Sequence, residues 1–372
     1  MTAPIPLGDW RDAGIAVSGL NAADNPAPGV AVARSLREAG HRGRLVGLAY
    51  DAMDAGIYNR QLFDEVYLIP FPSRGSDALL HHLRLVRQQG RLDLVIPTLD
   101  SELELYLTLQ PELEEAGIHS FLPDEGGLAM RAKSRLAEFC HKHDFQVPPT
   151  EVVHSLEGLR DVWEDICDPD GREPVYVKGI FYDARKAWTV EQAMNSFVEI
   201  SARWGLPIIL QRGLAGFEYN ICCLGDGEGG LVGAVPMRKL GVTEKGKAWS
   251  GVTVGDPRLL ELAREMIAAL KWRGPCELEI LCEEETERLH LIEINPRFPA
   301  WCYLCAGAGQ NLPAALARRA LGGAPEVLPP ARSGVIYSRA AVDIICDLGV
   351  LEDLSVSGRA VHPSSGEAPR EC

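Results

Sequence analysis

The chain has 372 residues, and its 37 lysines and arginines against 52 aspartates and glutamates give a formal net charge of −15. Nucleic acid and anionic membranes repel an acidic protein, and no run of basic residues offsets that repulsion, so we expect neither as a partner. No stretch approaches the roughly eighteen continuous apolar residues of a membrane-spanning helix. Residues 1–10 lack the basic and apolar segments of a signal peptide, which predicts a cytoplasmic protein.

Short apolar segments alternate with amphipathic segments through the first 125 residues. The apolar runs are typical of buried strands, and the amphipathic segments have helical periodicity. The predicted strands cover residues 14–19, 45–50, 66–70 and 92–99, and the predicted helices cover 28–39, 77–89 and 101–116. Strands and helices in turn indicate a parallel α/β domain over residues 1–125.

The carboxyl ends of parallel strands are where such domains bind ligands, which draws attention to residues 18–25 and 98–102. The first segment has no Gly-x-Gly-x-x-Gly fingerprint, and this disfavours a dinucleotide-dependent oxidoreductase. In the second segment, Asp100 and Glu102 either contact a substrate or cap the next helix. The sequence leaves both interpretations open.

The pattern changes after Pro148 and Pro149, which follow a predicted helix over about residues 131–143. Strands in pairs that look antiparallel then alternate with helices. The predicted strands cover residues 174–178, 207–211, 218–224, 231–237, 276–281 and 288–295, and the predicted helices cover 190–204, 256–271 and 311–321. The glycine-rich run 225–230 lies between two strands, which favours a hairpin turn over a phosphate-binding loop.

These patterns predict three segments. The α/β domain of residues 1–125 precedes a module with mixed and antiparallel sheets over residues 126–325. Residues 326–372 form a C-terminal extension rich in Pro, Gly and Ser, and we expect a loose tail from about residue 355.

The ten cysteines are scattered through apolar segments of a long chain. Cys302 and Cys305 have the Cys-x-x-Cys spacing of redox and zinc sites. No second pair with motif spacing accompanies them, so we predict buried thiols.

The segment Leu291-Ile-Glu-Ile-Asn-Pro-Arg297 carries the strongest chemical signal. Strand alternation places Glu293 and Asn295 on one face, and Glu279 belongs to the preceding predicted strand, where Glu277 shares its face. Carboxylate and amide oxygens that converge from adjacent strands suit Mg²⁺. A carboxylate between apolar neighbours is costly unless it holds a metal or a partner.

The Glu-x-Asn-Pro-Arg run after a strand, preceded by Gly-x-x-x-x-Glu, resembles the metal-binding signature of the ATP-grasp superfamily of carboxylate–amine and carboxylate–thiol ligases. The sequence around it is similar to the carbamoyl-phosphate-synthase branch. Similar order and spacing run from about residue 125 to 325, and the preceding α/β unit looks like the domain that usually comes before this module.

The resemblance implies roles for individual residues. Nucleotide-binding roles fall on Lys133, Lys178, Gln211, Arg212, Leu214, Glu218 and Arg238, catalytic roles on Arg297, Lys239 and Asn295, and metal-binding roles on Glu279, Glu293 and Asn295. Positive charge around Arg238 and Lys239 suits a transferring phosphoryl group.

Two features depart from the family pattern. Lys178 is followed by Gly-Ile-Phe-Tyr-Asp-Ala-Arg-Lys in place of Pro and a glycine-rich loop, and we expect Arg185 and Lys186 to take over part of the phosphate cover. Where the family usually has a glutamate after the hinge Gln, this chain has Arg212 after Gln211.

Phe298 and Trp301 follow the signature directly. Their position slightly favours contact with the acceptor substrate over packing.

The activity implied by the resemblance is an ATP- and Mg²⁺-dependent ligation, with Mn²⁺ as an alternative metal. ATP phosphorylates a small-molecule or peptide carboxylate, ADP leaves, and an amine attacks the acyl phosphate to form an amide. We expect such a ligase to act in natural-product biosynthesis, and a homodimer is one oligomeric state to test. Two alternatives stay open: phosphorylation of bicarbonate or carbamate, and a nucleotide-binding subunit without catalysis.

Overall fold

The structure is a computed structural model that describes residues 9–21, 26–179, 183–243, 246–325 and 328–362. The chain divides into two compact units, which are described separately. The first unit comprises residues 1–125, 222–277 and 295–372, and the second comprises residues 126–221 and 278–294. Strands β9 (Gly216–Asp226), β12 (Arg273–Glu283) and β13 (Leu289–Asn295) run from one unit into the other.

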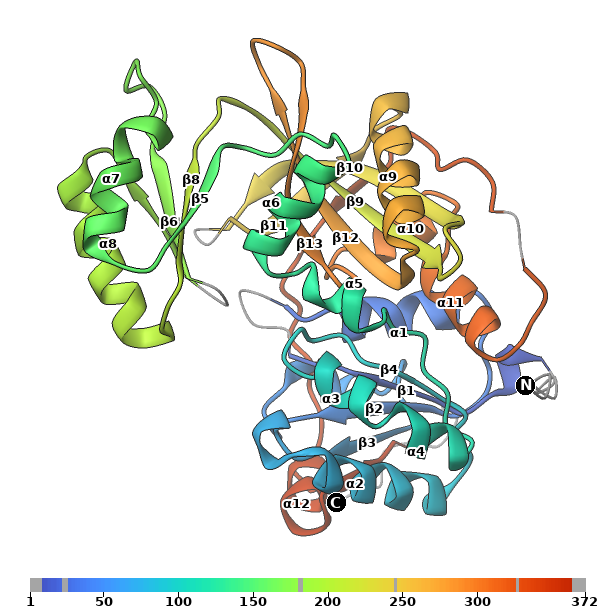
Figure 1. Ribbon diagram of the computed structural model, residues 1–372. Coiled ribbons are helices and arrows are strands. Elements are labelled where there is room, and N and C mark those ends of the chain that lie inside the picture. Colours follow the sequence, from blue (N-terminus) through green and yellow to red (C-terminus); the bar gives the residue numbers. More distant parts are fainter. Residues whose placement is uncertain (1–8, 22–25, 180–182, 244–245, 326–327, 363–372) are drawn as a thin grey trace. The chain divides into compact units, whose positions relative to one another are not determined.

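The N-terminal part of the first unit is a parallel α/β sheet, as the sequence predicts. Its strand order is β15-β3-β2-β1-β4, and the pairs β1–β2, β2–β3 and β1–β4 are parallel. The strands are β1 (Ile15–Ser18), β2 (Leu45–Ala49), β3 (Glu65–Leu68), β4 (Leu94–Ile96) and β15 (Arg359–Val361). Figure 1 shows α1 (Gly29–Glu38) on one side of this sheet and α2 (Ser76–Gln89) on the other.

The predicted helix over residues 101–116 is two shorter helices, α3 (Leu103–Thr108) and α4 (Gln110–Glu115). Pro111 lies at the start of α4, where a missing backbone N–H costs little, so it begins a second helix. At the start of α1, a Cβ on Gly29 would come within 2.1 Å of the Ser18 carbonyl oxygen. Glycine therefore lets α1 begin directly against the end of β1.

The C-terminal extension contains more order than the sequence suggests. Helix α12 (Gly349–Ser357) leads into β15, which pairs antiparallel with β3 through Arg359 and Tyr67. The prediction of a loose tail from residue 355 is therefore wrong for residues 355–361. Residues 363–372 lie outside the described part of the chain. The predicted boundaries at residues 125 and 325 stay predictions.

A second, six-stranded sheet has the order β13-β12-β9-β10-β11-β14. Its remaining strands are β10 (Leu231–Val242), β11 (Ala248–Thr253) and β14 (Ile336–Ser338). Strands β9 and β10 are neighbours joined by the predicted glycine-rich turn, in which Asp226 accepts hydrogen bonds from the amides of Glu228 and Gly230. Helices α9 (Pro257–Leu270), α10 (Tyr303–Gly307) and α11 (Leu312–Ala320) also belong to the first unit.

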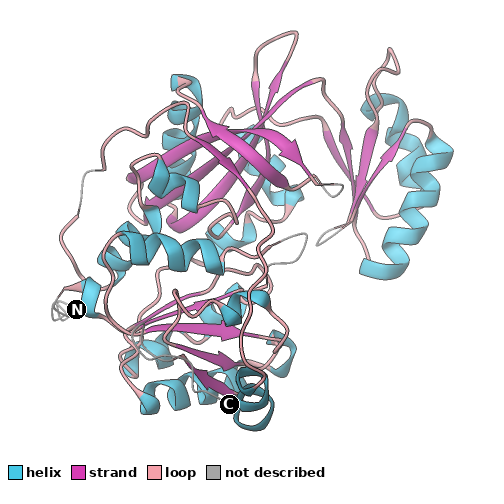
Figure 2. Cartoon of the chain, turned by 180° about the vertical axis from the view of Figure 1, so that it is seen from behind, coloured by secondary structure: helices cyan, strands magenta, loops and turns pink. Residues whose placement is uncertain are grey.

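The second unit contains a four-stranded antiparallel sheet with the order β5-β8-β6-β7. Its strands are β5 (Thr150–Val153), β6 (Val175–Lys178), β7 (Ala184–Ala187) and β8 (Ile208–Arg212). Figures 1 and 2 show helices α7 (Leu156–Ile166) and α8 (Val190–Trp204) on one face of this sheet, where they bury Val175, Val177 and Leu210. The opposite face is free of these helices and carries the candidate site.

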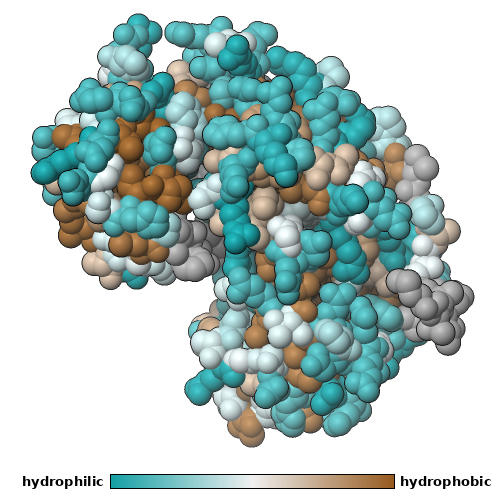
Figure 3. All heavy atoms as spheres, in the orientation of Figure 1, coloured by the Kyte–Doolittle hydropathy of each residue, from teal (hydrophilic) through white to brown (hydrophobic). Residues whose placement is uncertain are grey.

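Helices α5 (Glu125–Ala129) and α6 (Lys133–Lys142) precede the four-stranded sheet. Hydrophilic residues cover most of the face shown in Figure 3, in keeping with the acidic composition. Among the described residues, none of the helices combines the length and apolar character needed to cross a membrane.

Candidate active site

Strand register brings Lys178 and Gln211 onto the uncovered face of the four-stranded sheet. Val175 and Val177 of β6 point into the core, so Tyr176 and Lys178 point away from it. Gln211 lies opposite Tyr176 on β8 and is only 6% exposed. The Lys178 Nζ donates to Gln211 Oε1 at 2.6 Å, and Gln211 Nε2 donates to Thr150 Oγ1 at 3.1 Å. A chain of hydrogen bonds therefore fixes the lysine on this face.

Four charged groups of the second unit act on Lys178. The pKa of Lys178 is lowered to about 8, chiefly by burial and then by the positive charge of Lys133. The carboxylates of Glu293, Glu279 and Glu218 oppose this shift. These two lysines and three glutamates, which the sequence assigned to nucleotide and metal, thus lie within electrostatic reach of Lys178.

Lys133 and Glu293 are in direct contact. Lys133 is the first residue of α6, and its Nζ lies 3.1 Å from Glu293 Oε2 on β13. The two segments are held together by a backbone hydrogen bond of 2.8 Å from the Leu291 amide to the Gln146 carbonyl. The pair is partly shielded, with side-chain exposures of 14% for Lys133 and 32% for Glu293.

Arg185 and Lys186, which were predicted to cover the phosphates, lie on opposite faces of the four-stranded sheet. Lys186 lies opposite Tyr176 on β7, and its Nζ is 5.8 Å from the centroid of that ring, whereas the Lys178 Nζ is 5.4 Å away. Arg185 instead lies opposite the core residue Val177 and forms an ion pair with Glu199 of α8. Only Lys186 therefore shares the face of Lys178, and residues 180–182 lie outside the described part of the chain.

The hinge residues are also split by strand alternation. Arg212 lies opposite Val175, on the helix-covered face, where Nε donates to the Ile166 carbonyl at 3.0 Å and Nη2 to the Asp165 carbonyl at 2.7 Å. This guanidinium caps the end of α7, as basic groups do at helix C-termini, and is not beside Lys178. Leu214 lies in the short link from β8 to β9, and Glu218 is exposed on β9.

The oxygen donors predicted to bind metal all lie on strands. Glu279 is on β12, and Glu293 and Asn295 are two residues apart on β13, so the last two share a face. Two carboxylates and an amide are hard oxygen donors of the kind that Mg²⁺ takes together with phosphate and water. No group of three or more His, Cys, Asp or Glu side chains suited to a metal occurs among the described residues. By their chemistry, the two carboxylates and the amide fit Mg²⁺.

Glu277 organises the segment that follows β13, although the sequence assigned it no role of its own. Its side chain is almost fully buried, and it accepts hydrogen bonds from Trp301 Nε1 at 2.7 Å and from Asn295 Nδ2 at 3.2 Å. Arg297 Nη1 lies 3.7 Å from the same carboxylate. The sequence showed only that Glu277 lies on the same face of its strand as Glu279. The contacts of Glu277 with Trp301, Asn295 and Arg297 arise from tertiary packing, which the sequence pattern does not predict.

Phe298 and Trp301 are core residues rather than exposed contacts for an acceptor. Both belong to the main hydrophobic cluster, with exposures of 0% and 5%. Cys302 and Cys305 are buried in the same cluster and have free thiols, as predicted.

Arg238 and Lys239 are adjacent on β10 and therefore point to opposite faces of the strand. Lys239 is in register with Gly251 of β11, which is in register with Tyr337 of β14. The pKa of Tyr337 is raised to about 12, chiefly by burial; the charges of Arg339 and Lys239 oppose this shift, and the carboxylate of Glu277 adds to it. Lys239 and Glu277 thus both act on Tyr337, whereas Arg238 points to the other face of β10.

The open question about Asp100 and Glu102 is resolved for Glu102. It is fully buried, and its Oε1 accepts hydrogen bonds from the backbone amides of Thr98 at 2.8 Å and Leu99 at 3.0 Å. Ser18 Oγ and Tyr50 OH also donate to it. Burial raises the pKa of Glu102 against the effect of these donors. The residue fixes the turn before α3 and makes no side-chain capping bond to that helix.

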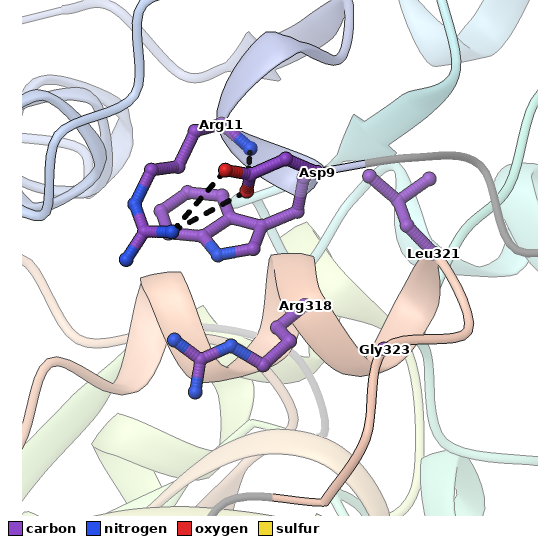
Figure 4. A pocket seen from close by; sticks show the side chains of 6 residues that line it. Asp9, Arg11, Arg318, Leu321 and Gly323 are labelled. Carbon is purple, nitrogen blue, oxygen red and sulfur yellow. Dashed lines mark hydrogen bonds and ion pairs between the residues drawn. The ribbon is translucent and has the colours of Figure 1, made fainter.

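A cavity of about 290 Å³ lies elsewhere in the first unit, between the short 3-10 helix Trp10–Asp12 and the end of α11 (Figure 4). The residues that line it are Asp9, Trp10, Arg11, Arg318, Leu321 and Gly323. Asp9 and Arg11 form an ion pair with each other there. The cavity contains none of the residues predicted to bind nucleotide, metal or substrate.

Comparison with known proteins agrees with the sequence motifs. Residues 206–341 match the family described as ATP-grasp in the biosynthetic pathway with Ter operon. No curated protein matches the sequence. Many solved structures are similar to this chain.

Three similar solved structures are informative. The biotin carboxylase domain of Hydrogenobacter thermophilus 2-oxoglutarate carboxylase, in complex with MgADP, ADP and bicarbonate, has a TM-score of 0.65 and 16% identity, covering 87% of this chain and 73% of that chain. N5-carboxyaminoimidazole ribonucleotide synthetase from Thermus thermophilus has a TM-score of 0.60 and 16% identity, covering 84% and 79%. L-amino acid ligase from Bacillus licheniformis has a TM-score of 0.60 and 14% identity, covering 84% and 74%.

Proposed function

We propose that the protein is an ADP-forming carboxylate–amine ligase, which the match of residues 206–341 to an ATP-grasp family and the folds of the similar solved structures support. The observation that carries this proposal is the charge cluster of the second unit. Two lysines suited to phosphates, Lys133 and Lys178, lie with the carboxylates of Glu279 and Glu293 in one compact unit.

The lysines suit the polyphosphate of ATP. Lys178 is held by the neutral acceptor Gln211, which leaves its positive charge uncompensated by that bond. An anionic phosphate would take the place of water around a partly buried ammonium group and would favour its charged form. Lys186 on the same face would add positive charge near the phosphates.

Glu279, Glu293 and Asn295 would hold Mg²⁺, or Mn²⁺ in its place. When bound, the metal neutralises phosphate charge and polarises the transferring group. Asn295 Nδ2 donates to Glu277, so the amide oxygen Oδ1 is directed away from that carboxylate. Glu277 therefore sets the orientation in which Asn295 presents its oxygen donor.

The reaction consists of two displacements. A carboxylate oxygen attacks the γ-phosphorus of ATP and ADP leaves, which gives an acyl phosphate. The amine then attacks the acyl carbon, phosphate leaves with the oxygen that came from the carboxylate, and the amine loses a proton. Arg297 would stabilise the negative charge on the acyl phosphate and on the tetrahedral species that follows, and Lys239 would add to this field.

The substrates are proposed to be a small-molecule or peptide carboxylate and an amine, used in natural-product biosynthesis. The description of the matching family, which refers to a biosynthetic pathway, supports this setting. The similar L-amino acid ligase supports an amine acceptor. Bicarbonate is the second candidate for the group that ATP phosphorylates, in place of a substrate carboxylate, because one similar structure is a complex with bicarbonate. A homodimer and a cytoplasmic location stay predictions from the sequence.

The test is a screen of the purified protein with MgATP against panels of amino acids, peptides, other carboxylates and bicarbonate, each with and without amines. ADP release is the first measurement. Active acids are then prepared with ¹⁸O in the carboxylate, and the released phosphate is analysed by mass spectrometry. Transfer of ¹⁸O to phosphate is expected for an acyl phosphate, and ADP release without transfer of ¹⁸O would contradict it.

Glu293→Gln tests the metal and the catalytic assignment together. It should abolish Mg²⁺-dependent ADP formation and weaken Mn²⁺ binding measured by electron paramagnetic resonance, because an amide is a poorer ligand than a carboxylate. Glu284→Gln is the matched control, since Glu284 is exposed in the turn between β12 and β13. Normal turnover by Glu293→Gln would refute the metal assignment. A nucleotide-binding subunit without catalysis would form no ADP even as the wild-type protein or the Glu284→Gln control.

A further inference from the structure

We infer that Asp100 is a positioning residue that holds the Arg297 guanidinium for the transfer reaction. This inference rests on the proposed function, because it concerns the same chemistry. Arg297 Nε donates to Asp100 Oδ2 at 2.9 Å, although the two residues are 197 positions apart in the sequence. Both belong to the first unit. The side chains are partly shielded, with exposures of 14% for Arg297 and 32% for Asp100, so the contact is stronger than a surface ion pair.

Arg297 also has longer contacts, of which one is to the buried Glu277 of β12, whose carboxylate lies 3.7 Å from Nη1, and two are local. Nη2 donates to Asn295 Oδ1 at 3.4 Å, and Nη1 donates to the Phe298 carbonyl at 3.3 Å. Both partners belong to the segment that carries Arg297 itself, and they would move with it. Asp100 instead belongs to the turn after β4, so it ties the guanidinium to the N-terminal sheet. The bond to Asp100 is shorter than the contact with Glu277 and holds the Nε edge of the guanidinium.

The turn that carries Asp100 is fixed from inside the sheet. Glu102, with no exposed surface, accepts from the amides of Thr98 and Leu99 and from Tyr50 OH at 2.5 Å. Thr98 Oγ1 also donates to the Ser18 carbonyl at 2.9 Å. These bonds join the ends of β1, β2 and β4 to the turn. A rigid turn can hold its carboxylate in one place, as a positioning residue requires.

The two roles that the sequence left open for Asp100 are capping and substrate contact. The N-cap residue of α3 is Glu102, two residues later, and Glu104 is the acidic residue in the first turn of that helix. Capping therefore does not account for Asp100. A substrate contact would raise KM for the acceptor, whereas a positioning role acts on kcat through Arg297.

The kinetic test compares Asp100→Asn and Asp100→Ala with Arg297→Lys and with the double variant Asp100→Ala/Arg297→Lys. Asp100→Asn keeps the size of the side chain and removes its charge. Ser101→Ala is the matched control in the same turn, where the serine is exposed. We expect kcat for ADP formation to fall by about 100-fold in Asp100→Ala, with KM for ATP unchanged, because a small misplacement of a catalytic group has this effect.

The double variant separates positioning from a merely structural effect. If Asp100 acts through Arg297, Asp100→Ala has little further effect once Arg297 is replaced by lysine. Equal losses in both backgrounds would overturn the inference. So would a raised KM for the acceptor with unchanged kcat, which would make Asp100 a substrate contact.

A second measurement needs no activity. The Nε–Hε signal of Arg297 in ¹⁵N-labelled protein, assigned by its loss in Arg297→Lys, should exchange slowly with water in the wild type and rapidly in Asp100→Ala. Unchanged exchange in Asp100→Ala would overturn the inference. If the wild-type protein forms no ADP with any acceptor, the proposed function fails, and this signal still decides whether Asp100 holds Arg297.

Discussion

The lowered pKa of Lys178 predicts an unusual pH dependence of ATP binding. A lysine in water titrates near 10.5, so its charge is constant from pH 6 to 9. Burial on the face of β6, together with the charge of Lys133, brings the pKa of Lys178 to about 8 in the nucleotide-free protein. Lys178 should therefore lose its positive charge within the range in which affinity can be measured.

The size and sign of the effect follow from that value. With a pKa of about 8, roughly nine-tenths of the protein carries a charged Lys178 at pH 7, and about one-tenth does so at pH 9. The charged form binds phosphate and the neutral form does not attract it, so affinity is lost as pH rises through 8. We expect the affinity for MgATP to be about tenfold lower at pH 9 than at pH 7 if only charged Lys178 binds.

Calorimetric titration with a non-hydrolysable MgATP analogue, from pH 6.5 to 9.5 at constant ionic strength, measures this dependence. Repeating it at pH 8.5 in buffers of different ionisation enthalpy counts the protons taken up, which should be about three-quarters of a proton per nucleotide. The control is Lys178→Arg, whose guanidinium stays charged over this range and should give a flat profile. A flat wild-type profile, or the same slope in Lys178→Arg, would refute the assignment of the effect to Lys178.

Two further predictions concern the folded state. Ser155 accepts from the Gly158 amide at 3.0 Å at the start of α7, so Ser155→Ala should lower the free energy of unfolding by about 1 kcal/mol in urea titrations, while Ser155→Asn should retain most of it. An unchanged free energy of unfolding in Ser155→Ala would contradict this capping role. Burial lowers the pKa of His41, whose Nε2 is bonded to the Ala13 carbonyl at 2.9 Å, so the unfolded chain binds a proton more readily and stability should fall as pH drops below about 6.5. The unfolding free energy of His41→Gln should depend less on pH in this range, and an unchanged slope would exclude His41 as a source.

The sequence predicted those parts of the fold that depend on local pattern. The apolar runs of the N-terminal sheet became β1 to β4, and the signature segment became β13, because a buried strand must be apolar regardless of its partners. Strand β7 was missed, since Ala-Arg-Lys-Ala has no apolar alternation and is held by pairing with β6. Strand β15 was missed for a similar reason: its partner β3 lies almost 300 residues earlier, and local pattern contains no information about it.

The candidate site shows the same division between local and long-range information. Chain order alone indicated Lys178 and Glu293, but register decides that Lys186 shares the face of Lys178 whereas Arg185 and Arg212 do not. Those two arginines bond to the helix side of the sheet, where Arg212 closes the end of α7. A basic residue near a predicted site is therefore informative only once the side of its strand is known.

The two lysines of the second unit differ in how their charge is balanced, and this difference bears on their proposed roles. Lys178 is bonded to an uncharged amide, so an arriving phosphate does not have to displace an anion from it. Lys133 is paired with Glu293, which is also a proposed metal ligand. A cation bound at Glu293 would weaken the attraction between that carboxylate and Lys133, and the ammonium group would then be better able to bind phosphate. Glu293→Gln should thus affect nucleotide binding through Lys133 as well as metal binding, whereas substitution of Lys178 should change nucleotide affinity with little effect on the metal.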